Sequence, residues 1–355
     1  MMSYALSIAE KGLLWTSPNP MVGAVIVVNG KIIAEGYHEK YGEAHAEINA
    51  FNNLQNIPAD AVLFVTLEPC SIHGKTPPCT NAILDVGIKK IYAAMEDPNP
   101  KISGSGFDIL RKAGINVTVG IMEDKAKKLN ERYIKYISKG IPWVTLKVAQ
   151  TLDGRIADIN GSSKWITSEA SRKEVHKLRA SHDAVLVGAG TVIKDNPSLD
   201  VRHVNGKQPV KVIIDENLDS DVVSKVYGDK DSKTIIFTSV KDNNDKVAIF
   251  GDKGIDVVSF DDSAGLDIAW LLSKLASYGI SSLLVEGGSQ IFSSFLISGD
   301  VDRYVMFINS SFMGNGLETF RSAGFPIADR LKLSELSVEL IGDDIMLQGV
   351  PGVRK

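Results

Sequence analysis

Two short stretches decide the fold of the first half of the chain: YGEAHAEINA at residues 41–50 and TLEPCSIHGKTPPCT at residues 66–80. The sequence of 355 residues holds two cysteines, and both of them, Cys70 and Cys79, lie in the second stretch. In a reducing compartment, two cysteines close in sequence more often serve a metal or a reaction than a disulfide. The pattern therefore indicates a metal or catalytic site downstream of His45 and Glu47.

The residue types match a catalytic zinc site. Such a site uses three protein ligands and keeps one position open for water, and His45, Cys70 and Cys79 supply that number. Glu47 is then left free to move protons beside the bound water. The prolines before Cys79 are typical of a helix start, where the positive end of the helix favours a thiolate. Each residue alone would more often be a packed or solvated side chain, so the combination carries the prediction.

The rest of the first part predicts alternating strands and helices. Residues 21–37, MVGAVIVVNGKIIAEGY, predict a hairpin that turns at Asn29-Gly30. Further elements are expected as a helix from about Ala46, a strand over 61–67, a helix after Cys79, a strand over 89–95, a helix near 106–114, a strand over 115–120 and one long helix over 123–138. This order is typical of an α/β fold.

A domain boundary is expected at KGIPWV, residues 139–144, where a glycine and a proline end the long helix. We predict domains over residues 1–141 and 142–355, since this length favours two domains with separate cores. The second domain has its own strands, expected from 143 onward and over 183–188, 209–215, 234–239, 281–287 and 302–308.

Composition limits the partners. The chain is 44% hydrophobic and 23% charged, with a formal net charge of −4, which argues against a basic face for nucleic acid. The first residues lack the pattern of a signal peptide, and no apolar run of about 18 residues predicts a membrane span. We expect a cytoplasmic protein that binds a small molecule, with no nucleic acid and no membrane. Whether it forms a homo-oligomer is left open.

The second domain contains a candidate phosphate-binding turn. The Rossmann glycine fingerprint is absent: GAGTVI has Ile193 at the place of the third small residue. LLVEGGSQIF, residues 283–292, predicts instead a strand, a Gly-Gly-Ser turn and a helix whose first N–H groups could bind a phosphate. A plain turn between strand and helix is the alternative.

Several motifs together resemble a known family. His-Ala-Glu followed by Pro-Cys and Cys resembles the signature of zinc nucleobase deaminases, although eight residues separate the cysteines here instead of two. With SPNPMVGAVIV and EDPNP, it resembles the deaminase half of the bifunctional riboflavin-biosynthesis deaminase-reductases. KVAQTLDGRIA, WITS, VGAGTVIKDNPSL and VEGGSQIF resemble the reductase half.

This resemblance implies a cytidine-deaminase-like domain followed by a dihydrofolate-reductase-like domain. The implied reactions are hydrolytic deamination of 2,5-diamino-6-(5-phosphoribosylamino)pyrimidin-4-one and then NADPH-dependent reduction of the ribosyl group of 5-amino-6-(5-phosphoribosylamino)uracil to ribityl. The implied cofactors are Zn2+ and NADPH.

The resemblance also assigns residues. In the first domain, His45, Cys70 and Cys79 would bind zinc, Glu47 would be catalytic, and Asn19, Lys75 and Asp97 would bind substrate. In the second, NADPH would contact Ala149, Trp165, Thr191, Asp195, Gly288 and Ser289. Asp195 would also be catalytic, and the substrate would contact Ser163, Arg179, Leu199, Arg202 and Glu286.

Two histidines lie outside these assigned positions. Members of the family commonly have a histidine directly after Pro-Cys-Ser, where this chain has Ile72 and then His73. A substrate contact by His73 and an exposed loop position both stay open. His176 lies in RKEVHKLRAS, residues 172–181, a charged amphipathic stretch, and is expected to be solvated.

Two other functions remain to be distinguished. One is a nucleoside or tRNA deaminase fused to an unrelated reductase, which the acidic net charge and the long insert between the cysteines disfavour. The other is a binding module in which zinc is structural. That function needs a fourth protein ligand, for which His73 is the candidate nearest in sequence.

Overall fold

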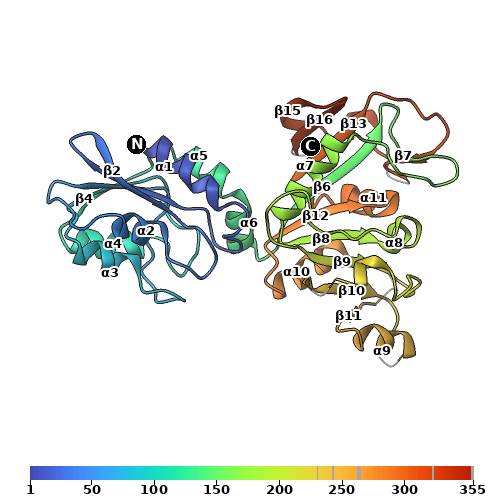
Figure 1. The fold of residues 1–355 in the computed structure, drawn as a ribbon, viewed down its shortest axis with the longest axis horizontal. Helices are drawn as coiled ribbons and strands as arrows, with labels where there is room; N and C mark the ends of the chain where they lie inside the picture. Colours follow the sequence, from blue (N-terminus) through green and yellow to red (C-terminus); the bar gives the residue numbers. More distant parts are fainter. Residues whose placement is uncertain (230, 242–243, 262–264, 322–323, 353–355) are drawn as a thin grey trace. The chain divides into compact units, whose positions relative to one another are not determined.

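A computed structural model describes residues 1–229, 231–241, 244–261, 265–321 and 324–352. The chain divides into two compact units, Met1–Ile141 and Pro142–Lys355. Both units are built from strands and helices in alternation (Figure 1). Among the described residues, no helix combines the length and the apolar character that a membrane crossing requires.

The first unit contains a five-stranded sheet in the order β2-β1-β3-β4-β5. Its strands are β1 (Gly23–Val28), β2 (Lys31–Tyr37), β3 (Val62–Val65), β4 (Lys90–Ala93) and β5 (Asn116–Val119). β1 is antiparallel to β2 and β3, whereas β3, β4 and β5 are parallel to one another. The predicted hairpin is confirmed: Asn29 and Gly30 have φ of 49° and 75°, as the tight turn between two twisted strands requires.

Helices cover both faces of this sheet (Figure 1). They are α1 (Met2–Ala9), α2 (Ala46–Asn52), α3 (Cys79–Asp85), α4 (Ser105–Lys112), α5 (Glu123–Leu129) and α6 (Glu131–Lys139). Side chains alternate between the two faces along a strand, and β1 therefore contributes to two cores. Val25 and Val27 pack in the core that contains α1. Ala24 and Ile26 pack in the core that contains α2 and α3. The strands and helices predicted for this unit are confirmed, with one exception.

The exception is the long helix expected over 123–138, which breaks at Asn130 into α5 and α6. Asn130 is buried, with φ −105° and ψ 21°. Its side-chain oxygen accepts a hydrogen bond from the Met21 N–H at 2.8 Å, and its amide nitrogen donates to the Met21 carbonyl at 3.0 Å. An asparagine that binds a backbone elsewhere can interrupt a helix, and the amphipathic pattern does not reveal that partner.

The second unit contains a nine-stranded sheet in the order β11-β10-β9-β8-β12-β6-β13-β16-β15. Its strands are β6 (Trp143–Thr151), β8 (Ala184–Gly188), β9 (Val210–Ile214), β10 (Thr234–Thr238), β11 (Asp256–Ser259), β12 (Ser282–Gly287), β13 (Arg303–Asn309), β15 (Leu333–Ile341) and β16 (Asp344–Pro351). The strands from β11 to β13 are parallel, and β16 and β15 are antiparallel. A small separate sheet pairs β7 (Arg155–Ala157) with β14 (Leu317–Glu318). The predicted strands are confirmed.

The helices of this unit bring two helix starts to one edge of the large sheet. The helices are α7 (Glu169–Ala180), α8 (Ala189–Asp195), α9 (Asp245–Gly251), α10 (Ile268–Ser277) and α11 (Ser289–Ser298). α8 follows β8 and α11 follows β12, and these two strands are parallel neighbours. Both helices therefore begin at the carboxyl edge of the sheet, where ligands bind in open α/β folds.

The helix break at Asn130 gives a stability prediction. Asn130→Ala leaves both backbone groups of Met21 without their partners, so the free energy of unfolding of the first unit should fall by about 1–3 kcal/mol. Urea unfolding followed by circular dichroism measures this change. Asn52→Ala, at an exposed position in α2, is the matched control and should change stability by less than about 0.5 kcal/mol. Equal effects of the two substitutions would contradict a structural role for the Asn130 pairing.

Candidate active sites

Three side chains of the first unit converge as candidate metal ligands. His45 precedes the first residue of α2, Cys70 lies in the loop after β3, and Cys79 is the first residue of α3. Their donor atoms all lie within 4.8 Å of one another. The His45 Nδ1 is 3.2 Å from the Cys79 Sγ and 3.5 Å from the Cys70 Sγ. Tetrahedral zinc would hold its nitrogen and sulfur ligands roughly 3.5 Å apart, so the donor set fits zinc.

The ligand set leaves room for water. Among the residues that the structure describes, this group of histidine, cysteine and acidic side chains contains His45, Cys70 and Cys79 and no fourth member. A structural zinc site would normally be closed by a fourth protein ligand. The arrangement is that of a catalytic site and argues against the binding-module alternative.

Glu47 lies beside these ligands and is buried, with 3% of its surface exposed. Burial raises the pKa of its carboxyl to about 7, and the negative charge of Cys70 adds to this effect, while the charge of His45 opposes it. A carboxyl that titrates near neutral pH can both accept and release a proton there. The pKa of Cys70 is lowered, because the thiol of Cys79 and the ring of His45 form hydrogen bonds with its sulfur.

The residues predicted to bind substrate in this unit lie on loops. The Asn19 side-chain nitrogen is 3.2 Å from the His38 Nε2, and the Lys75 ammonium lies 4.0 Å from the centre of the Tyr41 ring. Asp97 is buried and accepts a hydrogen bond from the Tyr133 hydroxyl at 2.9 Å. Burial raises the pKa of Asp97, and the charge of Cys70 adds to this shift.

His73 is exposed, and its Nδ1 lies 3.2 Å from the carbonyl oxygen of its neighbour Gly74. Ile72, at the position where the family commonly has a histidine, is exposed as well. Among the described residues, the group of candidate metal ligands does not include His73. The structure thus places His73 on the surface of the insert between the two cysteines.

Two residues near this site were missed by the sequence analysis. His38 is buried, its Nδ1 lies 3.0 Å from the Ala44 carbonyl oxygen, and its ring centre is 5.4 Å from that of His45. Glu68 is buried and accepts hydrogen bonds from the backbone N–H groups of Asp97, Gly104, Gly106 and Phe107. The sequence offered a signal for each residue: His38 directly follows a strand, and Glu68 stands two residues before Cys70.

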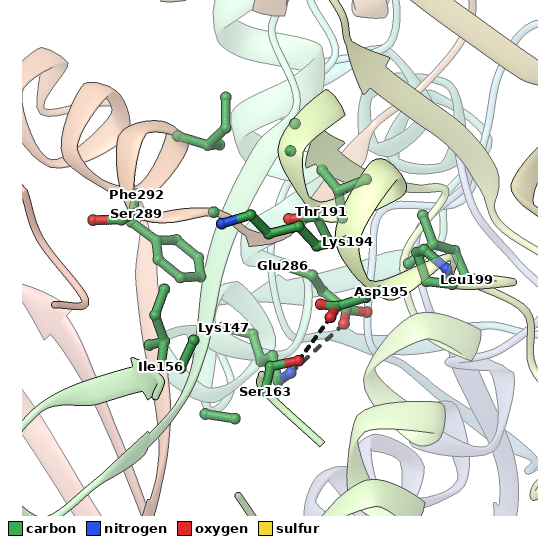
Figure 2. A pocket seen from close by; sticks show the side chains of 18 of the residues that line it. Lys147, Ile156, Ser163, Thr191, Lys194, Asp195, Leu199, Glu286, Ser289 and Phe292 are labelled. Atoms are coloured by element: carbon green, nitrogen blue, oxygen red, sulfur yellow. Dashed lines mark hydrogen bonds and ion pairs between the residues drawn. The ribbon is translucent and has the colours of Figure 1, made fainter. Parts of the chain in front are cut away.

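The second unit has a cavity of about 1830 Å3 at the carboxyl edge of its sheet. Figure 2 shows side chains from α8 and α11 around it. Every residue predicted to bind NADPH or the reductase substrate lines this one cavity: Ala149, Ser163, Trp165, Arg179, Thr191, Asp195, Leu199, Arg202, Glu286, Gly288 and Ser289. The structure therefore brings together residues that are up to 140 positions apart in the sequence, from 149 to 289.

The turn before α11 fits a phosphate. Gly288 has φ of 91°, a conformation that other residues rarely adopt, and a Cβ on Gly287 would lie 3.4 Å from the Thr191 hydroxyl oxygen. The Ser289 hydroxyl is buried and has no hydrogen-bond partner among the described residues. Open backbone, an unpartnered hydroxyl and a helix start together fit the pyrophosphate of a dinucleotide.

A buried ion network forms one wall of the cavity. Arg179 donates from Nε and Nη2 to the Glu286 carboxylate, the second bond at 2.9 Å, and the Lys147 ammonium lies 3.6 Å from the same carboxylate. Burial alone would raise the pKa of Glu286, but the charges of Arg179 and Lys147 outweigh it and lower the pKa to about 2. Lys147 lines the cavity but was not predicted, although it stands in the motif KVAQ (Figure 2).

Asp195 is the last residue of α8 and lines the same cavity. Its carboxylate accepts a hydrogen bond from the Ser163 hydroxyl at 2.9 Å, as Figure 2 shows. Trp165 is largely exposed, and the guanidinium carbon of Arg172 lies over its ring, 4.4 Å from the ring centre.

The prediction that His176 is solvated is wrong. This residue is 4% exposed and lines the cavity, because the side of α7 that carries it faces the sheet edge.

The fold and the two sites define a zinc-dependent deaminase unit joined to a reductase unit. Residues 1–95 match the cytidine and deoxycytidylate deaminase zinc-binding region, and residues 142–347 match the RibD C-terminal domain. The chain belongs to the RibD family, the bifunctional deaminase-reductases of riboflavin biosynthesis.

Similar proteins span the whole chain. The riboflavin biosynthesis protein RibD of Aquifex aeolicus is 46% identical over 347 residues, which cover 98% of this chain and 96% of the relative. The structure of Acinetobacter baumannii RibD superposes with a TM-score of 0.91 at 35% identity and covers 99% of this chain and 98% of that one. A Thermotoga maritima enzyme superposes with a TM-score of 0.87 at 39% identity, covering 99% and 97%.

These comparisons confirm the predicted fold class, a cytidine-deaminase-like unit followed by a dihydrofolate-reductase-like unit. They also confirm an enzyme of riboflavin biosynthesis whose deaminase domain binds zinc and whose reductase domain is of the NADPH-using kind. The alternative of an unrelated reductase is wrong, because the second unit matches the RibD reductase domain over most of its length.

The donor set predicts one tightly bound zinc ion per chain. Elemental analysis of protein purified without chelators should find it, and Cys70→Ser or Cys79→Ser should remove most of it, since each loses one of the three ligands. Glu47→Gln is the matched control and should keep the metal, because this carboxyl is not a ligand. Absence of zinc from the unaltered protein, or a disulfide between the two cysteines in freshly reduced protein, would contradict the assignment.

Proposed function

We propose that the chain deaminates 2,5-diamino-6-(5-phosphoribosylamino)pyrimidin-4-one and then reduces 5-amino-6-(5-phosphoribosylamino)uracil at its ribosyl group. The observation that carries this proposal is the open three-donor group with a buried carboxyl, Glu47, beside it. The similar Thermotoga maritima structure supports the substrates: it is described as a diaminohydroxyphosphoribosylaminopyrimidine deaminase and 5-amino-6-(5-phosphoribosylamino)uracil reductase. We assign deamination to residues 1–141 and reduction to residues 142–355.

In the first site, His45, Cys70 and Cys79 would hold zinc, which supplies a Lewis acid that makes water nucleophilic at neutral pH. Glu47 would carry a proton from the attacking water to the amino group, which leaves as ammonia while the water oxygen takes its place on the ring carbon. Its pKa of about 7 suits both steps. Asn19, Lys75 and Asp97 hold the pyrimidine and its phosphoribosyl group.

Glu47→Gln tests the division of labour between the units. An amide cannot carry the proton, so deamination should fall by at least about 100-fold, the lower end of what acid-base catalysis contributes. NADPH-dependent reduction of the already deaminated substrate should stay within about twofold of the unaltered enzyme, because the two units have separate cores. Assays of ammonia release and NADPH oxidation measure the two activities. Parallel loss of both in a folded protein would contradict separate sites.

In the second site, NADPH supplies the hydride for the sugar carbon. Thr191, Gly288 and Ser289 bind its phosphates, and Ala149 and Trp165 complete the cofactor surface. Ser163, Leu199 and Arg202 contact the substrate, with Arg179 and Glu286 on the adjoining wall. Asp195, held by Ser163, orients the reacting groups.

Gly288→Val tests the cofactor turn. A β-branched residue at φ 91° is strained and crowds the approach of a phosphate, so the Kd for NADPH should rise by at least about tenfold. Fluorescence titration measures the Kd, and zinc content and deamination should not change. Gly279→Val is the control, since Gly279 also has a positive φ but does not line the cavity, and a Cβ added there would meet no atom within 4 Å. Equal loss of NADPH affinity in both variants would point to general destabilisation.

Asp195→Asn tests the catalytic role of this carboxylate. The amide keeps the shape and can still bind Ser163, but it cannot carry charge or accept a proton, so single-turnover hydride transfer at saturating NADPH should slow by at least about tenfold. An unchanged rate would leave Asp195 with the role of ending α8 and remove it from the catalytic residues.

We further propose a small-molecule partner in the cytoplasm, without nucleic acid or a membrane surface. The formal charge of −4 and the free state of both cysteines support this proposal. Assembly into a homo-oligomer stays a hypothesis, for which sedimentation of the full chain is the measurement.

A further inference from the structure

His176 is a buried polar residue that no assigned role explains. It lies one turn before Arg179 on α7, and 4% of its surface is exposed. Its Nδ1 is buried and has no hydrogen-bond partner among the described residues, although the residue lines the reductase cavity. A buried polar nitrogen without a partner is costly, so a group that enters the cavity is expected to satisfy it.

Arg179 is poorly placed to bind the substrate's phosphate by itself. Its Nε and Nη2 are committed to Glu286, and its Nη1 donates to the Asp200 carbonyl at 3.2 Å. These bonds engage three of its five N–H donors, including the Nε and Nη2 edge that would otherwise bind a phosphate through two parallel hydrogen bonds. Arg179 thus holds Glu286 and the chain at Asp200 in place, and further donors near this wall would complete a phosphate site.

Two possible donors, Arg202 and His203, follow Asp200 and lie near His176. His203 lies with its ring centre 4.6 Å from that of His176, and the two ring planes are 82° apart. Arg202 is exposed and pairs with the half-buried Asp200 at 2.9 Å, so its guanidinium can turn toward a ligand without leaving a fully buried charge unpaired. All three side chains line the same cavity.

We propose that His176 donates a hydrogen bond to the phosphate of the reductase substrate, and that His203 and Arg202 bind the same phosphate from the loop side. This inference rests on the proposed function of the second site and adds a specificity residue to it. The 5-phosphate of the phosphoribosyl group is the part of the substrate that these donors fit.

The electrostatic surroundings agree with a neutral donor. Burial and the positive charges of Arg179, His203 and Arg202 lower the pKa of His176 to about 4, while Asp200 opposes them. The ring is therefore neutral at pH 7, with one N–H to donate. The neutral His176 ring can donate to a phosphate oxygen without repelling the positively charged side chains around it.

His176→Leu tests the contact in the full-length enzyme. It should raise the KM for 5-amino-6-(5-phosphoribosylamino)uracil by about tenfold, which corresponds to about 1.4 kcal/mol, with kcat within about twofold. His176→Gln, which keeps a donor, should recover most of the affinity. Lys177→Ala, on the same helix but paired at the surface with Glu174, is the matched control and should have no effect.

Two ligand probes, ribose 5-phosphate and ribose, distinguish the phosphate of the substrate from the phosphates of NADPH. Ribose 5-phosphate should lose affinity for the His176→Leu protein, while ribose should bind both proteins equally weakly, and the Kd for NADPH should not change. A loss of NADPH affinity alone would assign His176 to the cofactor and overturn the proposal. Unchanged affinities for all probes would also overturn the proposal and would indicate that a buried water is the partner of the His176 Nδ1. Failure of the unaltered enzyme to reduce its substrate would instead contradict the proposed function.

A measurement on the unaltered protein keeps the test independent of folding. The chain has six histidines, so nitrogen-15 labelling of histidine gives a spectrum that can be resolved residue by residue. Ribose 5-phosphate should shift the ring nitrogen signals of His176 and His203, and ribose should not. Unshifted signals at saturating ribose 5-phosphate would overturn the proposal even if the variants fail to fold.

Discussion

Parallel strands place the chemistry of this protein, because their carboxyl ends meet at one edge of a sheet. In the first unit, Cys70 follows β3 and Asp97 follows β4, and these strands are parallel neighbours. In the second unit, α8 follows β8 and α11 follows β12, again parallel neighbours. Each site is thereby assembled from loops that are distant in sequence and adjacent in the fold.

Buried carboxylates then fix those loops. Glu68 accepts backbone hydrogen bonds from Asp97 and from the first turn of α4, so it ties the loop after β4 to the loop that carries Cys70. Glu286 ties β12 to α7 through Arg179 and to β6 through Lys147. Loss of Arg179 or Lys147 would leave an uncompensated charge on Glu286, so this ion network holds its side chains in one arrangement.

The sequence predicted most of the fold because the strands are short apolar runs between clear turns. Of the strands in the large sheet, it missed β11, β15 and β16. The side chains of β11 and β15 are exposed or half-buried at the sheet edges, so these strands lack the apolar pattern of a core strand. In β16 the buried residues are Asp344, Met346 and Gly349, which do not form an apolar pattern either. The grouping of His45, Cys70 and Cys79 could be predicted because their residue types and order are specific. The burial of His176 could not, because it depends on residues distant in sequence, among them His203, whose ring packs against it, and Glu286, which lines the same cavity. Glu68 and Lys147 lie inside recognisable motifs, but only the structure shows their partners.

The most direct test of two active sites on one chain is the mass of the product formed from 2,5-diamino-6-(5-phosphoribosylamino)pyrimidin-4-one. Without NADPH, the product should have one amino group replaced by oxygen and an unchanged ribosyl group. With NADPH, the same product should gain two further hydrogens. Reduction without deamination, or no change of mass in protein that contains zinc, would contradict the account.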